Sequence, residues 1–155
     1  MTSPFRIAVA GLGTVGIGTL KILKEKSDIL AQRAQRPLEV VAVSARNKER
    51  DRGFNISDFY WYDDAAKMAA DCDCDVVIEL IGGCDGIAKQ VCENAISKGH
   101  HVVTANKALL AIHGTEIAQI SEKAGVAFAF EAAVAGGVPV VKTLRESLSG
   151  NTVSR

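Results

Sequence analysis

The sequence predicts an α/β fold in which a doubly wound parallel sheet carries helices on both faces. Three observations support this prediction. Short apolar segments alternate with amphipathic ones along the 155-residue chain, the first apolar segment ends in a glycine-rich turn, and no repeat or low-complexity tract interrupts the alternation. Because βαβ crossovers are right-handed, two consecutive units of this kind give the strand order 3-2-1-4-5-6.

The first elements are the clearest. Phe5–Ala10 (FRIAVA) is a short apolar run that ends in glycine, as expected of a buried parallel strand. One helix is predicted from Thr14 onward, since apolar residues recur at helical spacing until Pro37. The second strand is expected at Val40–Ser44, and the charged, irregular stretch Arg46–Asn55 is predicted to be a loop.

The middle of the chain continues the alternation. We expect a short third strand at Phe59–Tyr62 and then a small helix through Ala70, capped by Asp63 or Asp64. Asp75–Ile81 (DVVIELI) predicts the fourth strand, which ends at a pair of glycines.

The last part of the chain supplies two more strands and three helices. Asp85 is predicted to cap a helix that ends near Gly99. The elements expected after it are a strand at His101–Thr104, a helix at Ala108–Ala124, a strand at Val126–Phe130 and a helix at Val140–Leu148. Pro139 stands where the first turn of this last helix would begin, as its fixed φ favours.

Composition narrows the functional classes. Eighteen basic residues balance eighteen acidic ones, so the overall charge favours neither nucleic acid nor a membrane surface as a partner. No segment approaches the roughly 18 apolar residues of a membrane span, and the N-terminal residues lack a secretory signal pattern. We therefore expect a cytoplasmic protein whose binding depends on a local site.

The cysteines and histidines do not form a metal-binding pattern. The four cysteines are Cys72, Cys74, Cys84 and Cys92. They contain no CxxC pair, so reduced thiols are expected rather than a zinc site. The three histidines, His100, His101 and His113, have no carboxylate or cysteine at ligand spacing, and we expect surface or core imidazoles.

The glycine-rich turn predicts a phosphate-binding site. Gly11 permits a tight turn, Gly13 lets the backbone approach a pyrophosphate, and Gly16 lets the helix pack closely on the strand. The free N–H groups of Thr14 and Val15, at the positive end of the helix, would hold the phosphates. Because the motif follows a strand and opens a helix, the sequence predicts a Rossmann-type dinucleotide site. The turn residues predicted to bind the cofactor are Gly11, Leu12, Gly13, Thr14, Val15 and Gly16.

The end of the second predicted strand indicates the type of dinucleotide. An acidic residue there would bind a ribose 2′-hydroxyl, but this sequence reads Ser44-Ala45-Arg46-Asn47-Lys48. Because a guanidinium can bind a phosphate through two hydrogen bonds, Arg46 favours NADP over NAD. The alternative is that Arg46, Lys48, Arg50 and Arg52 form a solvated loop, partly neutralised by neighbouring acids.

Three more segments end at the same predicted edge of the sheet, where doubly wound folds bind ligands. They are residues 79–83 (ELIGG), 104–107 (TANK) and 131–139 (EAAVAGGVP). Gly82 and Gly83 would let a nicotinamide ribose approach the backbone, or would form a plain turn. Lys107 beside a nicotinamide would hydrogen-bond a substrate oxygen or assist proton transfer; a solvated surface lysine is the equal alternative.

Four segments together resemble the N-terminal half of homoserine dehydrogenase. They are AVAGLGTVG at 8–16, VVIELIGG at 76–83, VVTANKALLAIHG at 102–114 and FEAAVAGGVPVV at 130–141. The resemblance covers essentially the whole chain. It implies a homo-oligomeric oxidoreductase that interconverts homoserine and aspartate 4-semialdehyde with a nicotinamide cofactor, in the biosynthesis of threonine, methionine and isoleucine.

The resemblance also implies roles for individual residues. Thr14 and Val15 would contact the cofactor, Thr104 would line the nicotinamide side, and Lys107 would lie between cofactor and substrate. A monovalent cation, typically sodium, is implied at Glu131, Val134, Gly136 and Val138. Backbone and carboxylate oxygens suit such a hard cation; a helix-starting turn is the alternative.

Members of this family continue into a mixed-sheet domain that supplies substrate ligands, a second lysine and most of the dimer interface. We therefore expect residues 1–150 to form the dinucleotide-binding domain and residues 151–155 to begin a linker, so that the chain alone binds dinucleotide without oxidising homoserine. Two alternatives stay open. A non-catalytic dinucleotide-binding regulatory module would not need Lys107, and the coenzyme domain of aspartate semialdehyde dehydrogenase would need a nucleophilic cysteine and a histidine.

Overall fold

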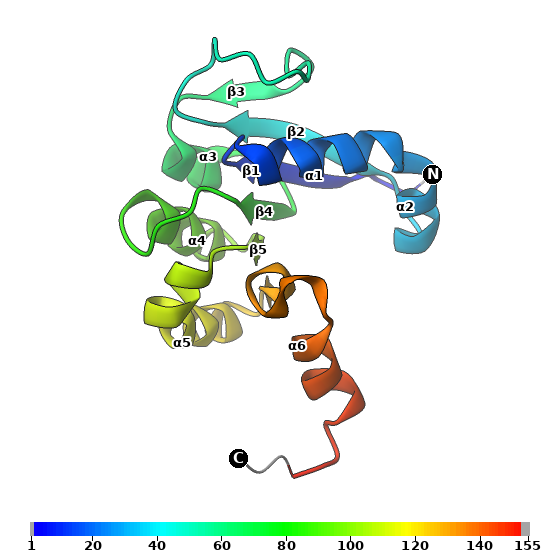
Figure 1. Ribbon diagram of the computed structural model, residues 1–155, viewed down its shortest axis with the longest axis vertical. Helices are drawn as coiled ribbons and strands as arrows, with labels where there is room; N and C mark the ends of the chain where they lie inside the picture. Colours follow the sequence, from blue (N-terminus) through cyan, green and yellow to red (C-terminus); the bar gives the residue numbers. More distant parts are fainter. Residues whose placement is uncertain (1, 153–155) are drawn as a thin grey trace.

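The computed structural model describes residues 2–152, which contain one six-stranded sheet (Figure 1). Every strand pair is parallel, and the order is β3-β2-β1-β4-β5-β6. The chain therefore starts in the middle of the sheet, builds one side, and then crosses over to build the other. This confirms the predicted doubly wound topology and places the switch point between β1 and β4.

The strands are β1 (Phe5–Ala10), β2 (Leu38–Ser44), β3 (Tyr60–Tyr62), β4 (Val76–Glu79), β5 (His101–Thr104) and β6 (Phe128–Ala129). The helices are α1 (Thr14–Glu25), α2 (Ser27–Ala34), α3 (Ala65–Asp71), α4 (Ile87–Ser97) and α5 (Lys107–Ala124). After β6 come two 3-10 turns, Glu131–Ala133 and Ala135–Gly137, and then α6 (Val140–Lys142), which runs into a π-helical turn at Thr143–Ser147.

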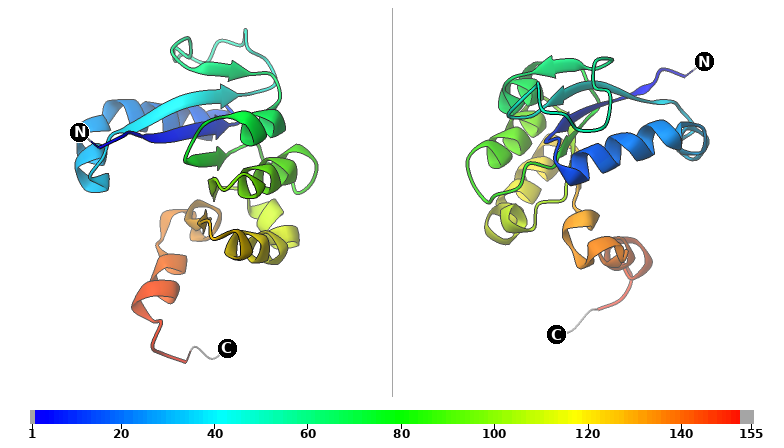
Figure 2. Two further views of the ribbon diagram at one scale, coloured as in Figure 1. Left: turned by 180° about the vertical axis from the view of Figure 1, so that it is seen from behind. Right: turned by 45° about the horizontal axis from the view of Figure 1, so that its top comes forward.

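The core has two layers because alternate residues of a strand point to opposite faces of the sheet. Val9 of β1 packs with Leu20 of α1 in one hydrophobic cluster. Its neighbour Ala8 belongs to a second cluster, with Met68 of α3 and Val91 of α4. Helices thus cover both faces of the sheet, while residues 140–152 extend away from it (Figure 2).

The first predicted helix is two helices in the structure. Lys26 has φ −112° and ψ 19°, and it ends α1 and begins α2. No residue of α2 is buried, so packing does not hold it in line with α1. The prediction of one helix up to Pro37 was wrong in this respect, because both segments share the same apolar period.

Three strands are shorter than predicted. The third begins at Tyr60 and not at Phe59. The fourth strand ends at Glu79 and not at Ile81, because the Glu79 carboxylate accepts the Ile81 N–H and draws the backbone out of the sheet. The sixth is reduced from Val126–Phe130 to two residues that pair with β5.

Helix starts were predicted with mixed success. Asp64, and not Asp63, caps α3, since its carboxylate accepts hydrogen bonds from the Ala66 and Lys67 N–H groups. The prediction that Asp85 caps the next helix was wrong. Gly86, with φ 69°, precedes α4, and Asp85 instead contacts His113 of α5.

No helix in residues 2–152 is long and apolar enough to cross a membrane.

Candidate dinucleotide-binding site

The glycine turn between β1 and α1 is packed as closely as its sequence predicts. Gly11 has φ +102°, and a Cβ on it would lie 2.6 Å from the backbone carbonyl of Leu80. A Cβ on Gly16 would overlap the carbonyl oxygen of Gly11. Leu12 points into the core and is 5% exposed, whereas Gly13 is exposed and open space surrounds the position of its absent Cβ. The turn is therefore packed against the protein at Gly11 and Gly16 and open to solvent at Gly13.

The first turn of α1 offers unpaired N–H groups to this open side. Gly13 is the N-cap residue, no side chain of the described residues caps the turn, and the turn holds no acidic residue. Thr14 and Val15 are both exposed, Val15 by 59%. Free N–H groups at the positive end of a helix dipole suit an anion such as a phosphate.

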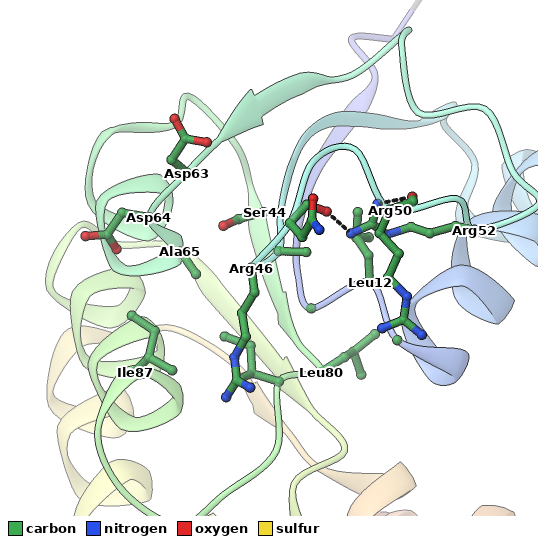
Figure 3. Close-up of a pocket in the computed structure, with 15 residues that line it drawn as sticks. Leu12, Ser44, Arg46, Arg50, Arg52, Asp63, Asp64, Ala65, Leu80 and Ile87 are labelled. Atoms are coloured by element: carbon green, nitrogen blue, oxygen red, sulfur yellow. Dashed lines mark hydrogen bonds between the residues drawn. The ribbon is translucent and has the colours of Figure 1, made fainter.

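A pocket of about 520 Å³ opens beside this turn at the carboxyl edge of the sheet (Figure 3). Its walls come from the glycine turn, the end of β2, the start of α3 and the end of β4. They include Leu12, Ser44, Arg46, Arg50, Arg52, Asp64, Leu80 and Ile87. The lining thus combines the apolar side chains of Leu80 and Ile87 with basic ones, a combination that fits a ring bearing charged phosphates.

Arg46 and Arg50 bring two positive charges to the pocket, whose lining also includes Asp63 and Asp64. Figure 3 shows the Arg46 side chain extending from the end of β2 toward Leu80. Neither arginine forms a salt bridge with any residue between 2 and 152. The acidic neighbours in the sequence therefore do not neutralise them directly.

The loop that carries these arginines is folded back on itself. The Arg52 guanidinium donates hydrogen bonds to the carbonyl oxygens of Asn47, Lys48 and Arg50, the last at 2.7 Å. Asn47 Oδ1 also accepts the Glu49 N–H at 2.9 Å. The Arg52 guanidinium is therefore occupied by hydrogen bonds within the loop, whereas that of Arg46 is not. No short motif in the sequence indicates this role for Arg52.

The predicted nicotinamide-side residues lie at the ends of β4 and β5. Gly82 and Gly83 are exposed, with φ of +83° and +87°, conformations that favour glycine. Thr104 is fully buried, and its hydroxyl donates to Glu79 Oε2 at 2.6 Å. Lys107 is exposed as the first residue of α5, directly after Asn106, whose side chain caps that helix.

The segment implied to bind a cation follows β6. Glu131 starts the first 3-10 turn, and its carboxylate accepts the Lys142 N–H at 3.2 Å. Val134 is extended, Gly136 has φ 57°, and Val138 is 58% exposed. Within residues 2–152 there is no group of three or more His, Cys, Asp or Glu side chains placed to hold a metal ion. Any cation here would thus need main-chain oxygens in addition to the Glu131 carboxylate.

The cysteines are free thiols, and three of them are buried: Cys72, Cys74 and Cys92. Burial raises the pKa of Cys92 to about 12, which makes its thiolate scarce at neutral pH. His113 of α5 is the histidine with the most side-chain contacts. Its ring lies 2.7 Å from Asp85 and 3.5 Å from Glu116, so two carboxylates are near it.

The fold and this site define a class: a Rossmann-type dinucleotide-binding domain, with a closely packed glycine turn at the start of α1 and a basic loop beside it. A family model described as "Homoserine dehydrogenase, NAD binding domain" matches residues 11–131, and the chain belongs to this family. The family match confirms the resemblance seen in the sequence. Together with the glycine turn, it supports a nicotinamide dinucleotide as the cofactor.

Individual proteins similar to this chain are homoserine dehydrogenases. The homoserine dehydrogenase of Pseudomonas aeruginosa is 44% identical over 153 residues, which are 97% of this chain and 34% of that protein. That of Neisseria gonorrhoeae is 42% identical over 150 residues, with coverages of 97% and 34%. The crystal structure of a homoserine dehydrogenase from Thiobacillus denitrificans has a TM-score of 0.87 and 40% identity, covering 96% of this chain and 34% of that one. The chain thus spans about a third of the length of the curated relatives it matches.

Proposed function

We propose that this chain is the cofactor-binding part of a homoserine dehydrogenase, which transfers a hydride between NADP(H) and the homoserine/aspartate 4-semialdehyde pair. The observation that carries the proposal is the pocket where the glycine turn, the uncapped first turn of α1 and the basic loop meet. The family match and the relatives' names support the choice of reaction. The reaction implies a biosynthetic role for threonine, methionine and isoleucine, and a cytoplasmic location.

The proposed cofactor is NADP, with NAD as the weaker ligand. The phosphates would accept hydrogen bonds from the N–H groups of Thr14 and Val15, and the ribose 2′-phosphate would lie against Arg46. Leu12, Gly13 and Gly82 would contact the cofactor through their backbones. An archaeal homoserine dehydrogenase of the same fold, 22% identical with a TM-score of 0.77, was solved in complex with NADPH.

Lys107 is proposed as the catalytic residue of this chain. The bound nicotinamide supplies or accepts the hydride. The Lys107 ammonium would donate a hydrogen bond to the substrate oxygen that gains or loses a proton, and its exposure at the start of α5 leaves its Nζ free to do so. We propose sodium or another monovalent cation at Glu131, Val134, Gly136 and Val138, where one carboxylate and three carbonyls offer hard oxygen donors.

The proposed domain organisation places residues 1–150 in the dinucleotide-binding domain and residues 151–155 at the start of a linker. The substrate site and a homo-oligomer interface would then belong to the part of the relatives that this chain does not match. We accordingly expect cofactor binding without homoserine oxidation by the 155 residues alone.

Isothermal titration calorimetry of the purified chain with NADPH and NADH tests the proposal. We expect saturable binding of one NADPH per chain, tighter than that of NADH, and no homoserine-dependent reduction of NADP. Equal affinities would contradict the cofactor preference, and turnover by the chain would contradict the domain assignment.

A further inference from the structure

Glu79 is a fully buried carboxylate at the end of β4, where the chain enters the turn to α4. Its Oε1 accepts hydrogen bonds from the N–H groups of Ile81 at 2.7 Å and Gly82 at 3.3 Å. Its Oε2 accepts one from the Thr104 hydroxyl at 2.6 Å. One side chain therefore holds the turn after β4 and the end of β5 at the same time.

The contacts continue through Asn106 and close into a ring. The Thr104 hydroxyl oxygen accepts the Asn106 N–H at 3.0 Å, and Asn106 Nδ2 donates to the carbonyl oxygen of Gly83 at 2.6 Å. Asn106 Oδ1 accepts the Leu109 N–H at 3.1 Å and so caps α5. The position of Gly82 and Gly83 is thereby tied to the first turn of α5, where Lys107 stands.

A carboxylate at position 79 destabilises the fold relative to an apolar residue, if its only function is to fill the core. Burying a charged group costs free energy that hydrogen bonds only partly offset, and an apolar residue would complete the run Val76–Ile78 at lower cost. What the carboxylate adds is a fixed arrangement of the exposed glycines 82 and 83 relative to the end of β5, which leads to the exposed Lys107. This suggests that the arrangement serves a ligand.

The position of these two segments indicates which part of the dinucleotide would lie against them. In the proposed binding mode the adenosine lies by β2 and the phosphates lie at the start of α1, so the rest of the dinucleotide extends past β4 toward β5. The glycines at 82 and 83 leave room for it, since open space surrounds the positions of their absent Cβ atoms.

We propose that Glu79 is a positioning residue for the nicotinamide half of the cofactor, acting through the 81–83 turn and through Thr104 and Asn106. The inference rests on the proposed function. It also assigns Thr104 a positioning role in place of the direct cofactor contact expected from the sequence, because its buried hydroxyl is already used twice.

The test compares two ligands that share the adenosine half: NADPH and adenosine 2′,5′-bisphosphate. In the 155-residue chain, E79Q keeps the shape of the side chain but replaces one acceptor oxygen with a donor. We expect NADPH to bind about tenfold more weakly, as loss of a hydrogen bond to a charged group predicts, while binding of the bisphosphate changes less than about twofold. E39Q, at an exposed residue of β2, is the matched control and should change neither affinity.

Thr104 supplies a second route if E79Q does not fold. T104V removes the hydroxyl at nearly constant volume and should reproduce the NADPH-selective loss, whereas T104S retains the hydroxyl and should restore most of the affinity. Equal weakening of both ligands, or no weakening of NADPH, in the variant that folds would overturn the positioning role. Failure of the wild-type chain to bind the bisphosphate would instead refute the proposed function, so the two results are distinguishable.

Discussion

The Cα of Gly16 faces the carbonyl oxygen of Gly11 so closely that a methyl group on Gly16 would overlap that oxygen. The start of α1 is therefore in direct backbone contact with the turn that leaves β1. This contact fixes the direction of the α1 axis, and with it the N–H groups of Thr14 and Val15, relative to the pocket. The proposed phosphate site therefore depends on the absence of a side chain at position 16.

Substitution of Gly16 by alanine should separate these two backbones. We expect G16A to lower the stability by about 1–3 kcal/mol, as overpacking of a close contact does, and to weaken NADPH binding. Gly18, two residues along the same helix, has open space around its absent Cβ. G18A should therefore bind NADPH normally and be more stable than wild type by up to about 1 kcal/mol, through helix propensity. Thermal unfolding and calorimetry of both variants measure this contrast, and equal behaviour would contradict the packing argument.

Substitution of Arg46 by alanine should reduce discrimination between the two cofactors. Loss of a guanidinium–phosphate contact predicts a decrease of roughly tenfold in NADPH affinity, with NADH affinity nearly unchanged because NADH lacks the 2′-phosphate. R33A removes the same charge from exposed α2, far from the pocket, and should affect neither ligand. If R46A leaves NADPH affinity unchanged, Arg46 does not contact the phosphate.

Asp64 should contribute more to stability than the adjacent Asp63. Asp64 accepts two N–H groups at the start of α3, and loss of such a cap costs about 1 kcal/mol. D64A should then lower the melting temperature by about 2–4 °C. Asp63 instead accepts the indole N–H of Trp61 at 2.7 Å, so D63A should mainly change tryptophan fluorescence. A larger thermal effect of D63A would be inconsistent with this assignment.

Asp85 should give a small stabilisation that disappears in acid. The hydrogen bond from His113, followed by that from the Cys84 thiol, holds the pKa of Asp85 below its ordinary value. A lowered folded-state pKa contributes stability above the unfolded pKa, and this is lost as the pH falls through the folded pKa. D85N should therefore melt slightly below wild type at pH 7, and the gap should close below about pH 4.

The effect of Asp85 should be modest because its side chain is 69% exposed and solvent screens the pair. D58N, at an exposed loop residue, is a suitable control. Melting temperatures recorded between pH 3 and 7 measure the difference. A gap between D85N and wild type that widened in acid would show that the sign is wrong.

Much of the fold was predictable because the strands are short apolar runs with clear ends. β1 and β5 match their predicted bounds, since glycine follows the first and the polar residues Asn106 and Lys107 soon follow the second. The strand order followed from crossover handedness alone. By contrast, the break at Lys26 leaves no mark in the apolar period, and it was missed.

The candidate site was only partly predictable, for a different reason. The glycine turn and Arg46 are local features, and both line the pocket. The contacts of Glu79 with Thr104 and of Asn106 with Gly83 join residues more than 20 positions apart, so no short motif contains them. An acidic residue inside an otherwise apolar strand was the signal available in the sequence.

Binding of the dinucleotide in this pocket is best tested by titrating the ¹⁵N-labelled chain with NADPH and following the backbone amides by NMR. We expect the amides of Gly13, Thr14 and Val15 to shift, together with those of Arg46 and Gly82, and the amides on the exposed helix α2 to stay unchanged. Saturating NADPH that leaves the 11–16 turn unshifted, or that shifts a different edge of the sheet, would contradict the claim that this pocket binds the dinucleotide.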